Sequence, residues 1–289
     1  MRYAISNWIY GVEPLREQFS RLARFGYQGI ELVGEPERYS VEEVRKLSRE
    51  FHIPVTSILS WCLAGIPGRD PASPDPQVRG KALEYGKQCV DLANALEAAI
   101  LVVLPAPAGR TAPTGVPRDE QAWLEEYQQE WELAVDSLRQ LAAYAEQRGI
   151  LLGLEPINRY ETFLVNNLDQ ALRFIAEVGS EQLRLHLDTF HMNLEEADIA
   201  ETIRRAGGRL VNLHISDSNR QTPGQGHFDF HSLIRALKEI GYTGCLTLEP
   251  VPSGSDPLLM SMMSKNLALR DVYAQKGIQH LREIEASLQ

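Results

Sequence analysis

The sequence predicts an α/β fold, a (β/α)8 barrel in which parallel strands alternate with helices. Three observations support this prediction: apolar runs of strand length recur, amphipathic segments separate them, and 289 residues is the size of one such barrel. We therefore expect a single domain over residues 1–289. The eight expected strands lie at residues 3–8, 29–33, 53–60, 98–104, 150–155, 183–188, 210–216 and 245–250.

The segments between the expected strands have apolar residues three and four positions apart, which is typical of helices that cover a sheet. We expect a C-terminal helical extension from about Leu258 onward. The Pro- and Gly-rich stretches 64–76 and 105–117 follow the third and fourth strands and are predicted to be enlarged loops. A doubly wound open sheet is the alternative fold, and it is weakened because no GxGxxG turn follows the first strand.

Composition and charge disfavour several classes of protein. A formal net charge of −10 disfavours nucleic-acid binding, which depends on clustered Lys and Arg. We expect no membrane association and a cytoplasmic location, because the N-terminal segment does not resemble a signal peptide and no apolar run approaches about 20 residues. The three cysteines, Cys62, Cys89 and Cys245, are far apart and are predicted to be buried or incidental thiols without disulfide bonds.

Four consecutive expected strands each end in a potential metal ligand. In a (β/α)8 barrel the active site lies at the C-terminal ends of the strands, so these side chains should meet at one rim. Alternation along each strand directs them inward and directs the leucine that precedes each ligand toward the helices. The four residues are Glu155, Asp188, His214 and Glu249.

Three carboxylates and one imidazole suit Mn²⁺, Mg²⁺ or Co²⁺ better than a thiolate-preferring ion. One acidic residue at a strand end is more often a helix N-cap or a salt-bridge partner, but four in succession favour a metal site. Without a cation the carboxylates would repel one another in a partly desolvated mouth. For His186, two strand positions before Asp188, substrate contact and hydrogen bonding to a ligand both remain open.

Four motifs resemble those of the ketose 3-epimerases, which include the tagatose, allulose and ribulose 3-epimerases of the xylose-isomerase-like TIM barrel superfamily. The resemblance covers nearly the whole chain. The motifs are LEPINRYE (154–161), HLDTFHMN (186–193), HISDSNRQTPGQGHFDF (214–230) and TLEP (247–250).

This resemblance implies that the four strand-end residues bind one catalytic divalent ion, usually Mn²⁺ or Co²⁺ in the family. It also implies that Glu161, His191 and Arg220 hold the first three carbons of a ketose and their oxygens. Several family members are homodimers or homotetramers, so we expect a homo-oligomer.

Inversion at C3 of a ketose requires removal of a proton from one face and its return on the other through an enediolate. We expect Glu155 and Glu249 to be the two acid–base residues. A free ketose is expected rather than a sugar phosphate, because no phosphate-binding loop is evident.

The loop after the fourth strand departs from the family pattern, because it lacks an aromatic residue between positions 104 and 116. An apolar wall for the far end of the sugar is instead expected from Trp8, Trp61, Cys62 and Trp123, although core packing is the alternative for each tryptophan.

Several other functions remain open. An aldose–ketose isomerase, a hydroxypyruvate isomerase or an inosose dehydratase could use the same ligands. DNA-repair endonucleases of the superfamily hold several zinc ions with many more histidines. They are disfavoured because this chain has only seven histidines and an acidic net charge. A noncatalytic protein, either sugar-binding or a metal-stabilised scaffold, is disfavoured by the presence of both Glu155 and Glu249.

Overall fold

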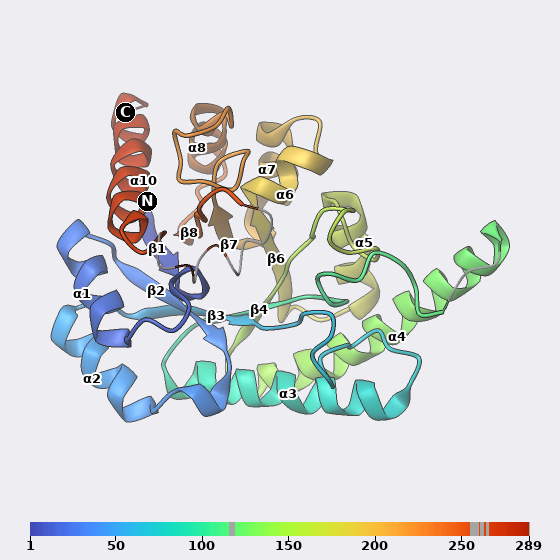
Figure 1. The fold of residues 1–289 in the computed structure, drawn as a ribbon. Helices are drawn as coiled ribbons and strands as arrows, with labels where there is room; N and C mark the ends of the chain where they lie inside the picture. Colours follow the sequence, from blue (N-terminus) through green and yellow to red (C-terminus); the bar gives the residue numbers. More distant parts are fainter. Residues whose placement is uncertain (116–118, 255–259, 261–262, 264–265, 289) are drawn as a thin grey trace.

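The computed structural model describes residues 1–115, 119–254, 260, 263 and 266–288. Its strands form a closed parallel barrel in chain order, in which β1 pairs with β8, and this confirms the predicted (β/α)8 fold (Figure 1). The strands are β1 Arg2–Ser6, β2 Gly29–Gly34, β3 Val55–Ser60, β4 Ile100–Val103, β5 Leu151–Leu154, β6 Leu183–Asp188, β7 Leu210–Ile215 and β8 Cys245–Leu248.

The helices form an outer layer around the strands (Figure 1). The expected C-terminal extension is a helix that packs between α1 and α8, and it therefore takes the place of the eighth barrel helix. Leu258, where we expected it to begin, lies outside the described residues. The helices are α1 Leu15–Phe25, α2 Val41–Phe51, α3 Pro76–Ala95, α4 Glu120–Glu146, α5 Leu168–Val178, α6 Thr189–Glu195, α7 Ile199–Ala206, α8 Phe230–Glu239 and α10 Leu269–Ser287, with 3-10 turns η1 Asn7–Tyr10, η2 Pro36–Arg38 and η3 Gly207–Arg209.

Local sequence explains how individual helices begin and end. Helix α1 buries Phe19 and Leu22, which are three positions apart, and each contributes roughly 1.5–3 kcal/mol by leaving water. It ends at Gly26, whose φ of 76° is left-handed and favours glycine. Helix α5 begins at Asn167, whose side chain accepts a hydrogen bond from the backbone N–H of Gln170.

Side-chain alternation separates an apolar layer from a polar one. Four leucines that precede the predicted ligands are buried between barrel and helices: Leu154, Leu187, Leu213 and Leu248. The ligands therefore face the barrel interior, as predicted. Strands β5 and β8 are shorter than expected, and Glu155 and Glu249 follow them directly. Their backbone N–H groups still bond to the neighbouring strands, at Val103 O (3.1 Å) and Ile215 O (3.0 Å).

The predicted enlarged loops follow β3 and β4, as far as the second is described. They are joined to each other by a parallel bridge between Leu63 and Ala108. Arg110 anchors the second loop through an ion pair with Glu130 of α4, at 2.6 Å. The loops after β3 and β4 therefore form one connected wall at the mouth of the barrel.

The three cysteines are free and buried, as predicted. Within the described ranges, no helix combines the length and the apolar character needed to cross a membrane.

Candidate active site

A cavity of about 570 Å³ opens at the C-terminal ends of the strands. One end is polar and the other is apolar. The polar end is lined by Glu155, Glu161, His191, His214, Arg220 and Glu249, and the apolar end by Trp61, Leu63, Ala64, Leu104, Ala108 and Ile157.

The four predicted metal ligands meet at the polar end. Each is at most 4% exposed. Nδ1 of His214 lies 3.4 Å from Oε1 of Glu155 and 3.4 Å from Oε2 of Glu249. Asp188 completes the group, since its carboxylate and the donor atoms of His214 and Glu249 all lie within 4.8 Å of one another.

Two separations between these donor atoms fit a divalent cation. Two atoms that each lie about 2.1 Å from one ion are about 3.0 to 3.4 Å apart, depending on the angle between them. The two separations from His214 Nδ1 fall at the upper end of this range. Three carboxylates and one imidazole also match the hard, oxygen-rich ligand set that the sequence predicts.

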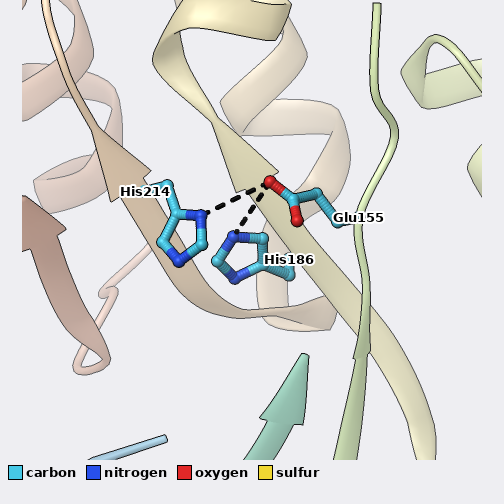
Figure 2. A group of neighbouring side chains, drawn as sticks. All are labelled: Glu155, His186 and His214. Carbon is cyan, nitrogen blue, oxygen red and sulfur yellow. Dashed lines mark ion pairs between the residues drawn. The ribbon is translucent and has the colours of Figure 1, made fainter. Parts of the chain in front are cut away.

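His186 lies beside two members of this group, Glu155 and His214 (Figure 2). Its Nε2 is 3.7 Å from Glu155 Oε1, and its ring lies edge-on to that of His214 at 4.0 Å between centroids. Gly153 makes room for it, because a Cβ there would lie 3.0 Å from the Cβ of His186. Burial and the nearby His214 hold the pKa of His186 well below its ordinary value. His186 does not line the cavity. Its position therefore favours contact with a predicted metal-ligating residue over contact with substrate.

Glu31 is a buried carboxylate that the sequence analysis did not single out. It lies in β2 with no exposed surface, and its Oε1 is 2.9 Å from Nε2 of His214. Burial opposes its ionisation, but the facing charge of His214 outweighs this effect and holds the pKa of Glu31 below its ordinary value. The signal in the sequence was a single acid in the otherwise apolar strand GIELVG.

Arg220 reaches the polar end from the loop after β7. Its two Nη atoms donate to Asp188 and Glu249. The backbone of Arg220 has a φ of 63°, a left-handed conformation that is uncommon for a residue other than glycine. Asp217, which we also missed, organises this loop: its carboxylate accepts hydrogen bonds from the backbone N–H groups of Gly224 (2.8 Å) and Phe228 (3.1 Å).

Asn158 links two of the predicted substrate-binding residues. Its Nδ2 donates to Oε1 of Glu161 at 2.9 Å and lies 2.8 Å from Nδ1 of His191. Because an amide nitrogen only donates, Nδ1 of His191 accepts, and the proton of the neutral ring is on Nε2. That Nε2 lies 3.5 Å from Oδ2 of Asp188, so the ring faces the predicted metal ligands.

The buried carboxylates and imidazole perturb one another. Burial, reinforced by Asp188 and Glu155, raises the pKa of Glu249 to about 8, against the opposing effects of Arg220 and His214. Burial disfavours the charged form of His214, but Glu249 and Glu31 outweigh it and raise the pKa of His214 well above its ordinary value. Protons and a cation therefore compete for this cluster.

The four residues of the predicted apolar wall lie in different surroundings. Trp8 and Trp61 line the cavity with ring centroids 6.4 Å apart, and Nε1 of Trp8 donates to Oε2 of Glu249 at 2.7 Å. Cys62 lies behind the wall, where it packs with Leu104 and its Sγ donates to a backbone carbonyl. Trp123 is absent from the described lining, because α4 holds its ring against Tyr127 with centroids 5.2 Å apart.

Comparison with known families agrees with this fold. Residues 19–284 match the family model described as "Xylose isomerase-like TIM barrel". The chain therefore belongs to the xylose isomerase-like TIM barrel family.

Within this family the chain is similar to carbohydrate epimerases. It is 33% identical to an L-ribulose 3-epimerase of Methylomonas sp. over 239 residues, which are 82% of this chain and 79% of that protein. It is 43% identical to a D-psicose 3-epimerase of Enterocloster bolteae over 117 residues, 40% of this chain and only 39% of that relative. A crystal structure of a D-allulose 3-epimerase from Methylomonas sp. in complex with D-allulose superposes with a TM-score of 0.81 at 29% identity, over 98% of this chain and 96% of that one. These similarities confirm the resemblance and support an enzyme of the isomerase class.

Proposed function

We propose that this protein is a metal-dependent ketose 3-epimerase that inverts C3 of a free ketose. Substrates of the allulose/fructose, tagatose/sorbose or ribulose/xylulose type fit the proposal. The observation that carries it is the pair of buried carboxylates, Glu155 and Glu249, each 3.4 Å from the same nitrogen of His214 in the lining of a cavity of about 570 Å³.

The proposed cofactor is one divalent ion, Mn²⁺ or Co²⁺, with Mg²⁺ as an alternative. Its proposed ligands are Glu155, Asp188, His214 and Glu249. Donor atoms of Asp188, His214 and Glu249 lie within 4.8 Å of one another, and Oε1 of Glu155 lies 3.4 Å from Nδ1 of His214. When bound, a divalent cation polarises a neighbouring carbonyl and stabilises the negative charge of an enediolate.

Glu155 and Glu249 are the proposed acid–base pair. They follow β5 and β8 and so approach the site from separate strands. Inversion at one carbon needs an acid–base group on each face of that carbon, which two residues from separate strands can supply. Glu249 is suited to exchange a proton near neutral pH, because burial raises its pKa to about 8. The N–H of Trp8 holds one oxygen of Glu249 in place.

Three further residues are proposed to bind the reacting end of the sugar. Arg220 presents a guanidinium, and His191 presents an N–H, to the carbonyl and hydroxyl oxygens. Glu161 presents a carboxylate that can accept from a hydroxyl, and Asn158 fixes its position relative to His191. Trp8 and Trp61 would exclude water from the far side of the sugar.

The proposal also covers the location, oligomeric state and domain organisation of the protein. We propose a cytoplasmic homodimer or homotetramer in which residues 1–289 form one domain. The small-molecule ketose is the proposed partner, in keeping with the relatives described above.

Isotope exchange with product analysis tests the proposed reaction. Metal-stripped protein is incubated with fructose, tagatose, ribulose or xylulose in D₂O, with and without Mn²⁺, and the products are separated by chromatography. We expect Mn²⁺-dependent formation of the C3 epimer with deuterium at C3. An aldose product would indicate an aldose–ketose isomerase, and a dehydrated product would indicate a dehydratase. A cation-bound protein that converts none of the four sugars would contradict the proposal.

A further inference from the structure

We propose that Glu31 is a positioning residue that holds His214 with Nδ1 directed at the cation and with the ring proton on Nε2. This inference rests on the proposed metal site and adds a residue that lies outside the four ligands. Glu31 belongs to β2, which is separated from β8 by β1 and from β5 by β3 and β4 in the closed barrel, so it comes from outside the group of strands β5 to β8 that carry the proposed ligands.

The two nitrogens of His214 face different groups. Nε2 lies 2.9 Å from Oε1 of Glu31, while Nδ1 lies 3.4 Å from Glu155 and from Glu249. A carboxylate only accepts hydrogen bonds, so Nε2 must donate to Glu31. The lone pair of Nδ1 then remains for a cation at the point where the ligand carboxylates converge.

Glu31 is itself held in place. Oγ of Ser57, its neighbour on β3, donates to Oε2 at 2.7 Å, and Nδ2 of Asn212 lies 3.4 Å from the same oxygen. The side chain has no exposed surface. Because Glu31 is fixed by two strands, it can in turn fix the plane of the His214 ring.

The negative charge of Glu31 is central to this role. Burying an ionised carboxylate is unfavourable unless it is paired, and Glu31 is paired with the imidazole of His214. A carboxylate that accepts from the remote nitrogen of a ligating histidine also makes the other nitrogen a stronger donor to the metal. A neutral residue of the same shape would keep the packing and lose this effect.

Cation binding to the metal-stripped protein tests the inference without any substrate. Mn²⁺ affinity is measured by isothermal titration calorimetry for the wild type and for Glu31→Gln, which keeps the size of the side chain and removes its charge. We expect the variant to bind Mn²⁺ about 10- to 100-fold more weakly. Unchanged affinity would overturn the inference and leave a purely structural ion pair.

Two further variants control for damage to the fold. Glu130→Gln removes a carboxylate that is equally buried (1% exposed) but is paired with Arg110 outside the site, and it should leave Mn²⁺ affinity unchanged. Ser57→Ala loosens Glu31 without removing a charge and should weaken Mn²⁺ binding by a few-fold. If Glu31→Gln does not fold, Ser57→Ala decides, and wild-type affinity in that variant would count against the inference.

The ring proton provides a second readout. In ¹⁵N-histidine-labelled protein loaded with Mg²⁺, His214 should show a hydrogen-bonded N–H at Nε2, and Glu31→Gln should weaken this bond. A proton on Nδ1 in the loaded wild type would contradict the inference. Failure of the proposed epimerase reaction can be distinguished from failure of this inference. A protein that binds Mn²⁺ through this arrangement but converts no ketose would contradict the proposed reaction and leave the role of Glu31 intact.

Discussion

The two halves of the barrel mouth have the same backbone architecture and opposite chemistry. At the C-terminal ends of β5 to β8, or directly after them, lie four residues that can ionise: Glu155, Asp188, His214 and Glu249. On the other side, the segments after β1, β3 and β4 contribute Trp8, Trp61, Leu63, Leu104 and Ala108 to the same cavity. In a parallel barrel the C-terminal ends of all strands lie at one rim. The residue type at each strand end therefore determines what that part of the rim contributes to the site.

This division has a physical consequence for the acidic half. Apolar side chains opposite the carboxylates reduce solvation of the cavity, which strengthens both the repulsion among carboxylates and their attraction for a cation. Glu31 is the exception to the division. It is a carboxylate from the half formed by β1 to β4, and it extends beneath the cavity to His214 rather than into it.

The largest expected effect comes from neutralising the acidic half. We expect Glu155→Gln to reduce kcat by about 10²- to 10⁴-fold at saturating Mn²⁺, because an amide cannot accept the C3 proton. Steady-state kinetics on the best ketose, with the bound metal quantified, would measure this. A variant that binds metal and keeps full turnover would remove Glu155 from the acid–base pair.

The pH dependence of metal affinity tests the raised pKa values in the acidic half. Burial raises the pKa of Glu249 to about 8, and a cation binds only the ionised carboxylate. The metal-bound state therefore holds fewer protons, so affinity should rise about tenfold or more per pH unit between about pH 6 and 8 and level off above. His214, whose pKa is also raised, acts in the same direction. Calorimetric titration with Mn²⁺ in buffers of different ionisation enthalpy would count the released protons, and affinity that is constant across this window would contradict the shift.

Substitutions in the apolar half should change the binding of the sugar more than the rate of the chemical step. We expect Trp61→Ala to raise KM by about three- to tenfold through lost apolar contact, with a smaller change in kcat. Mn²⁺ affinity should not change. Trp123→Ala is the matched control, because Trp123 packs against Tyr127 and does not line the described cavity. Equal KM effects in the two variants would show that Trp61 acts through packing rather than through substrate contact.

The sequence predicts those features of the site that depend on strand register alone. Once Glu155, Asp188 and His214 are placed at consecutive strand ends, barrel geometry brings them together, and the intervening leucines confirm the alternation. The roles of Glu31 and Asn158 depend on side-chain reach across the barrel or a loop, and no local pattern encodes that distance.

The apolar wall shows the opposite limit of sequence interpretation. Cys62 and Trp123 belong to the segments that surround the mouth, but the direction of each side chain depends on how the loop after β3 and the start of α4 pack. Aromatic composition near a predicted site is therefore weaker evidence than a residue at a strand end.

The smallest expected effect concerns His186, on the buried side of the acidic half. Neither ring nitrogen has a hydrogen-bond partner among the described protein atoms, and a buried polar group that has no partner at all costs about 1–3 kcal/mol. We expect His186→Met to leave the metal-free protein as stable as the wild type or to stabilise it by about 1 kcal/mol in urea unfolding. His231→Met, at an exposed position, is the control and should change stability by less than about 0.5 kcal/mol. A marked loss of stability at His186 would mean that a water molecule satisfies the ring, whereas unchanged stability with slower turnover would mean that His186 supports Glu155.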